Sequence, residues 1–191
     1  RNGNFLPVFL VAWGSGQNAL LSYLMMPFIA IFGLTTFSIR LPMAIIGGIS
    51  LGIFYCLLKR MTNKKVAIIG LIFLAICPWH IMKSRWGLES NLFPDLILLS
   101  VFLIIKGLQD QKRIYQIFGY IFAGLTAYAY GTSYFFLPLF FIPILCILVK
   151  RKEITIKQAI INLLIIGIIS LPIIIFVIIN TLDLPALNLP F

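Results

Sequence analysis

The chain has 191 residues and a net charge of +10, and it is 61% hydrophobic but only 10% charged. Soluble domains carry about 25% charged residues, and a soluble chain of this size still exposes roughly a third of its unfolded surface. This composition excludes a water-soluble fold and indicates an integral membrane protein. The basic residues therefore report loop orientation and do not point to nucleic-acid binding.

The first apolar segment covers residues 19–33, ALLSYLMMPFIAIFG, and follows the polar stretch Ser15-Gly16-Gln17-Asn18, which can cap a helix. It has fifteen residues and contains Pro27, whereas a spanning helix needs about 20 residues. Runs this short lie in the membrane interface more often than they cross the bilayer. We predict an interfacial juxtamembrane helix within an external loop over residues 1–40.

Six further apolar runs are long enough, or nearly long enough, to cross a membrane. They cover residues 41–58, 66–82, 92–105, 114–131, 134–149 and 158–179. The sequence therefore predicts an all-α polytopic membrane bundle, with one transmembrane domain over 1–191 and six spans across 41–179. Residues 180–191 would begin the next external loop. The spacing Gly48-x-x-x-Gly52 in the first span predicts close packing of another helix at that point.

Basic residues are concentrated in alternate loops. The loops 59–65, 106–116 and 150–157 contain eleven of the fifteen Lys and Arg residues, and the other side has only Arg1, Arg40, Lys83 and Arg85. Because positive charge marks cytoplasmic loops, we expect the three basic loops to be cytoplasmic. The segments 1–40, 83–91, 131–133 and 180–191 are then extracytoplasmic, in a multi-pass protein of the cell membrane.

One external stretch gathers the chain's polar chemistry. Residues 79–91, WHIMKSRWGLESN, hold the single histidine, two cations, an acid and two tryptophans. An arginine can hold an oxyanion through a bidentate fork, and a neighbouring lysine adds charge. We predict that Arg85, assisted by Lys83, binds a lipid phosphate. Glu89 would hold Arg85 in place or contact a polar substrate, and a simple ion pair is the alternative.

Other residues on the predicted outer face have a substrate-binding and a purely structural interpretation. The candidate substrate-binding residues are Arg40, His80, Asn91, Tyr130 and Tyr134. The structural alternatives are an interfacial arginine, a histidine at a helix end and a belt of interfacial tyrosines. Asp95 follows Pro94 at a helix start, where a carboxylate is favoured. A single histidine with Glu89 falls short of a zinc site, so no metal ligands are predicted.

The chain resembles the N-terminal membrane region of polyprenyl-phosphate-sugar-dependent glycosyltransferases of the GT-C superfamily. These include the protein O-mannosyltransferases and the lipid A aminoarabinose transferases. The resemblance covers nearly the whole chain. Its most specific parts are Ile31-Phe32-Gly33 followed by Arg40-Leu41-Pro42, and Ser84-Arg85 followed by Glu89-Ser90.

The resemblance implies a glycosyltransferase that moves a sugar from a polyprenyl-phosphate donor to a hydroxyl of a protein, lipid or wall polymer. Transfer would invert the anomeric configuration at the outer face of the membrane. Arg85 and Glu89 match the family's site arginine and acid by position. The family's catalytic base is an acid early in the first external loop, yet Glu89 is the first acid of this chain. The base is therefore expected upstream of Arg1, and this chain alone is expected to be inactive.

Cofactor use stays open in this interpretation, because Glu89 could contact a divalent metal ion as well as the acceptor. Two functions outside this class also remain. A transporter or flippase of lipid-linked sugars should carry ionisable residues near the middle of the membrane and repeated halves. A non-catalytic membrane scaffold on the same fold would differ from the enzyme only by the missing acid.

Overall fold

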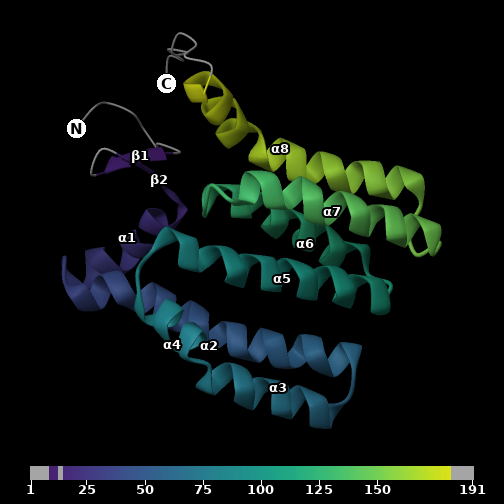
Figure 1. Cartoon of the computed structure of the whole chain (residues 1–191), viewed down its shortest axis with the longest axis horizontal. Helices are drawn as coiled ribbons and strands as arrows, with labels where there is room; N and C mark the ends of the chain where they lie inside the picture. Colours follow the sequence, from purple (N-terminus) through teal and green to yellow (C-terminus); the bar gives the residue numbers. More distant parts are fainter. Residues whose placement is uncertain (1–8, 13–14, 182–191) are drawn as a thin grey trace.

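The long helices lie side by side and roughly along one direction (Figure 1). This computed structural model describes residues 9–12 and 15–181. In chain order its elements are β1 (Phe9–Ala12), β2 (Ser15–Asn18), α1 (Leu20–Phe32), α2 (Thr36–Met61), α3 (Lys64–Ile76), α4 (Pro78–Arg85), α5 (Glu89–Gln109), α6 (Arg113–Leu125), the 3₁₀ helix η1 (Thr126–Tyr128), α7 (Ser133–Lys150) and α8 (Ile156–Thr181). The predicted all-α architecture is confirmed, with one short hairpin of β1 and β2 added.

The residues before the first helix differ from the prediction. Residues 15–18 form β2, which pairs antiparallel with β1, and do not cap a helix through their side chains. Helix α1 then covers the predicted interfacial segment and ends at Gly33, whose φ of +73° suits glycine. Helix α2 begins with a capping box, in which Thr35 and Ser38 each accept from the other's backbone N–H.

The predicted number of spans is not confirmed. Four helices are long and apolar enough to cross a membrane, namely α2, α5, α7 and α8. The predicted span 66–82 is divided into α3 and α4, which are bent by 59° and would make a fifth span if they act together. Pro78 opens α4 at its first position, where the missing N–H costs nothing, and so begins a new helix.

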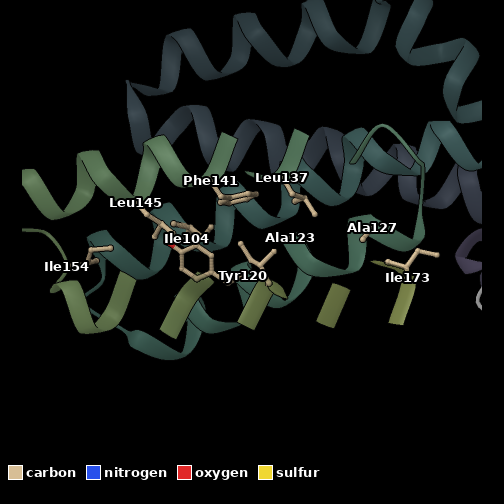
Figure 2. Packing of buried hydrophobic residues seen from close by; sticks show 10 residues of the cluster. Ile104, Tyr120, Ala123, Ala127, Leu137, Phe141, Leu145, Ile154 and Ile173 are labelled. Atoms are coloured by element: carbon tan, nitrogen blue, oxygen red, sulfur yellow. The ribbon is translucent and has the colours of Figure 1, made fainter. Parts of the chain in front are cut away.

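The predicted span 114–131 is also not found as one long helix. It folds as the 13-residue α6, which continues into the short 3₁₀ helix η1. Helix α6 lies in the middle of the bundle, packed closely on α5 and α8. The central cluster contains Tyr120 and Ala123 of α6 with Phe141 of α7 and Ile173 of α8 (Figure 2). A helix packed between two longer helices need not match the bilayer thickness, because its neighbours shield its ends.

Glycines bring α6 close to its neighbours. An added Cβ at Gly119 would lie 2.9 Å from the Ser100 carbonyl oxygen of α5, and one at Gly124 would lie 2.9 Å from Ile169 Cβ of α8. In α2 the glycine at a close contact is Gly47. Gly48 and Gly52, predicted to be the packing pair, have nothing within 4 Å of an added Cβ. The small-residue pattern therefore identified a helix that another helix approaches closely, but the close contact is made by Gly47 and not by Gly48 or Gly52.

The two ends of the bundle differ in composition. The turns α2–α3, α5–α6 and α7–α8 lie at one end, and these are the three basic loops (Figure 1). Helices α1 and α4 and the hairpin lie at the opposite end. Two basic turns are joined by an exposed ion pair, in which Arg60 Nη1 lies 2.8 Å from Asp110 Oδ1. The predicted external segment 180–191 lies, from residue 182 onward, outside the described residues.

Candidate active site

A groove opens at the end of the bundle where α2 and α4 meet. It has a volume of about 320 Å³ and is lined by Thr36, Phe37, Arg40, Leu41 and Ala44 of α2 and by Ser84 and Arg85 of α4. We call it the arginine groove, because both Arg40 and Arg85 line it and are exposed. Arg40 and Arg85, from different helices, therefore line one largely apolar groove, and a guanidinium group can bind an anionic ligand.

Helix α4 is placed against α2 by a close contact. A Cβ added at Gly47 would lie only 2.1 Å from Ser84 Oγ, so a larger residue there would push α4 away. The Ser84 hydroxyl donates to the carbonyl of His80 at 2.7 Å and is thereby satisfied within α4. Arg85 is the next residue and the last of the helix. The tight α2–α4 contact thus determines where the Arg85 side chain begins.

A second, more polar cavity is lined in part by the linker that follows α4. It has a volume of about 330 Å³, and Glu89 and Tyr130 line it together with Gln17, Asn18, Leu21, Ser22, Met25, Ile39, Gly87, Leu88 and Ser90. We call it the Glu89 cavity. The Glu89 carboxylate accepts a hydrogen bond from the backbone N–H of Asn18. Its acid is therefore tied to the end of the β-hairpin rather than to Arg85.

Asn18 is the residue of this site that sequence reasoning missed. Its side chain is 4% exposed and hydrogen bonded to the hydroxyl of Tyr134 at 3.1 Å. With the amide nitrogen facing Tyr134, the amide oxygen accepts from the N–H groups of Tyr130 and Gly131, at 3.2 Å each. Asn18 therefore joins the hairpin to the turn before α7. Asn18 lies between a polar stretch and an apolar run, and this position suggested only a helix cap, not a contact with the turn before α7.

The linker 86–88 connects Arg85, which lines one cavity, to Glu89, which lines the other. Asn91 holds this linker, because its side-chain nitrogen donates to the carbonyl of Trp86 at 3.1 Å. Arg85 precedes the linker and faces the arginine groove, and Glu89 follows it and faces the Glu89 cavity. A cation site and an acid site are thus placed next to each other by only three intervening residues.

Four of the predicted binding residues are not among the residues that line these cavities, namely Lys83, His80, Asn91 and Tyr134. Lys83 and His80 are each 4% exposed, buried on one face of α4. The Lys83 ammonium forms an ion pair with Asp95 of α5 and lies 5.7 Å from the ring centroid of Trp79. Asp95 is therefore an ion-pair partner and not a helix cap. Lys83 therefore faces Asp95, and its predicted assistance to Arg85 in binding phosphate stays a prediction.

The two predicted tyrosines lie in different places relative to the Glu89 cavity. Tyr130 lines the Glu89 cavity, and Tyr134 lies behind it, bonded to Asn18. Within the described residues, the two ion pairs are Arg60–Asp110 and Lys83–Asp95, so the predicted Arg85–Glu89 pair is not formed. No group of three or more His, Cys, Asp or Glu side chains clusters within residues 9–12 and 15–181.

The geometry defines a multi-pass membrane protein with a cationic groove beside an acid-containing cavity at one end. The sequence matches the family described as dolichyl-phosphate-mannose-protein mannosyltransferase over residues 18–179. The chain belongs to this family. No curated protein and no solved structure matches the chain.

Family membership implies a glycosyltransferase that uses a sugar carried on a lipid phosphate, together with an acceptor for that sugar. Such a donor carries an anionic phosphate, so the protein requires a site that binds this phosphate. The matched region contains Arg40, Arg85 and Glu89, all of the arginine groove and all of the Glu89 cavity except Gln17.

Proposed function

We propose that this chain carries the donor site of an inverting glycosyltransferase, in which the arginine groove binds the phosphate of a polyprenyl-phosphate sugar. The observation that carries this proposal is the convergence of Arg40 and Arg85 on one groove. The apolar lining from Phe37, Leu41 and Ala44 suits the first part of a lipid chain. A planar guanidinium can donate two parallel hydrogen bonds to a phosphate.

The chemistry follows from the two cavities. An acceptor hydroxyl attacks the anomeric carbon of the donor, its proton passes to a carboxylate, and the bond from that carbon to the phosphate oxygen breaks. The polyprenyl phosphate leaves with an additional negative charge, which Arg85 and Arg40 stabilise. A single displacement inverts the configuration. Glu89 contacts the acceptor or the sugar from the neighbouring cavity, and the structure assigns no group to the family's catalytic base.

The Glu89→Gln substitution is expected to lower the rate of sugar transfer by about 10- to 100-fold, because it removes the charge from a hydrogen bond to the acceptor or the sugar. Glutamine can still accept the Asn18 N–H bond, so the hairpin should stay attached and thermal stability should change little. Transfer rate and melting temperature would be measured together. An unchanged rate would remove Glu89 from the proposed chemistry, and an equal loss of stability would make its role structural.

The proposed site should face the outside of the cell. In a background in which Cys56, Cys77 and Cys146 are alanine, Leu88→Cys is expected to react with a membrane-impermeant maleimide added to intact cells. Lys65→Cys, at the basic end, should react only after the membrane is opened. Both positions are exposed in the structure. The reverse pattern would overturn the proposed orientation.

The activity itself is tested with the complete protein in proteoliposomes that contain dolichyl-phosphate mannose labelled in the sugar, together with a membrane extract as a source of acceptors. A transferase should release dolichyl phosphate and move label into a non-lipid or glycolipid product. A transporter or flippase would carry the labelled lipid across the bilayer without cleaving it. If the labelled donor is neither cleaved nor moved across the bilayer in repeated trials, the result would favour a non-catalytic scaffold.

A further inference from the structure

A buried ion pair connects α4 to α5 just behind the proposed site. Lys83 and Asp95 have side chains only 4% and 6% exposed, and Lys83 Nζ bonds Asp95 Oδ1. The other carboxylate oxygen, Oδ2, has no hydrogen-bond partner among the described residues. His80 is buried on the same helix face as Lys83. The pair is therefore a buried charged contact with the His80 imidazole and the Trp79 ring beside it.

Stability alone does not account for such a pair. The cost of removing two charges from water is repaid by their attraction only in part, and apolar residues of similar volume often do as well or better. What a directional ion pair supplies is register, because the ammonium must face the carboxylate.

The position of this pair places it where register matters most. Helix α4 has eight residues, is bent away from α3 by 59° and packs mainly against α2, so the ion pair supplies its contact with α5. Its contacts come from consecutive residues, since Ser84 packs on Gly47 of α2 and Lys83 bonds Asp95 of α5. Arg85 is the next residue. On α5, Asp95 lies six residues after Glu89, about 9 Å along the helix.

We propose that the Lys83–Asp95 ion pair is a positioning element, which holds α4 against α5 so that Arg85 and Glu89 face their two cavities at a constant separation. The inference rests on the proposed function of those cavities. Lys83 then acts through Arg85 and does not touch the phosphate. The pair would connect the donor site to the acid site across the linker 86–88.

The test combines a distance with a binding constant, in the complete protein reconstituted in nanodiscs. Spin labels at Met82→Cys on α4 and Lys112→Cys after α5, in the cysteine-free background, report the position of α4 relative to α5. Binding of dolichyl phosphate reports the arginine groove. The variants are Lys83→Met with Asp95→Leu, which removes both charges, and Lys83→Asp with Asp95→Lys, which exchanges them. Arg60→Met with Asp110→Leu removes the other ion pair and serves as the matched control.

The apolar double variant should insert normally, give a broader distribution of label distances and bind dolichyl phosphate about tenfold more weakly, since a displaced Arg85 loses a charge-assisted hydrogen bond. The exchanged pair should restore both measurements, and the control pair should change neither. Wild-type distances and affinity in the apolar double variant would overturn the proposal.

Wild-type distances with weakened binding in Lys83→Met alone and in the exchanged pair would also overturn it, because Lys83 would then be a direct phosphate contact. If one double variant fails to insert, the other decides by the same two measurements. Failure of the wild-type protein to bind dolichyl phosphate would contradict the proposed function, whereas the label distances would still test the positioning role.

Discussion

Replacing Arg85 by alanine is expected to weaken binding of dolichyl phosphate by about 10- to 100-fold, as losing a hydrogen bond between charged groups does. Sugar transfer should fall by about 10²- to 10³-fold, because the guanidinium stabilises the charge that develops on the leaving phosphate. Arg85 is exposed and makes no ion pair among the described residues, so insertion and thermal stability should stay close to wild type. Binding to nanodiscs and donor cleavage would be measured side by side.

Two further variants make this prediction specific. Arg85→Lys keeps the charge but loses the bidentate fork, so its affinity should fall between those of wild type and Arg85→Ala. Lys65→Ala removes an exposed cation at the opposite end of the bundle and should leave binding unchanged. If Arg85→Ala binds and transfers normally, the arginine groove is not the phosphate site. If Lys65→Ala is equally defective, the effect is one of net charge.

Replacing Gly119 by alanine is expected to destabilise the bundle by about 1–3 kcal/mol, the usual cost of overpacking. The added Cβ would lie 2.6 Å from Ile104 Cγ1, 2.9 Å from the Ser100 carbonyl oxygen and 3.0 Å from the Ile104 nitrogen. Two of these atoms belong to the backbone of α5 and cannot move aside as a side-chain end can. Helix α6 would have to separate from α5, the most extensive helix contact of the bundle.

The chain offers a matched control for Gly119. Gly48 is also a helical glycine, but nothing lies within 4 Å of an added Cβ there, so Gly48→Ala should be neutral or slightly stabilising because alanine favours helix. Thermal unfolding in detergent would compare the two variants. Equal melting temperatures would mean that α5 and α6 are not packed as described. A large loss in Gly48→Ala would indicate that this face meets another protein.

Hydrophobic run length predicted most of the helices, and for a clear reason. In lipid the backbone must satisfy its own hydrogen bonds, so a long apolar run has helix as its one available form. The runs 41–58, 92–105, 134–149 and 158–179 therefore became α2, α5, α7 and α8, each extended at its ends. The short run with Pro27 likewise became the separate helix α1. Charge distribution placed the three basic loops at one end, because alternate connections of such helices must share an end.

What run length could not predict was which helices cross the membrane on their own. The runs 66–82 and 114–131 look like the others in composition, but one bends at Cys77–Pro78 and the other ends early and packs between α5 and α8. Such packing depends on the neighbours that a helix finds, and a composition window contains no information about them. The same limit explains why Gly48 and Gly52 were chosen over Gly47.

The sequence likewise predicted which residues belong to the candidate site, and the fold decided how they are arranged. Residue type and the family resemblance singled out Arg40, Arg85 and Glu89, because cations and acids are rare in this chain and costly near lipid. The fold alone decided that the two arginines share a groove, that Glu89 bonds the Asn18 backbone and that Lys83 is turned inward to Asp95. Side-chain direction depends on helix rotation and on partners far away in the chain. A local stretch such as 79–91 therefore shows which groups are present, and packing against α2 and α5 determines what each one faces.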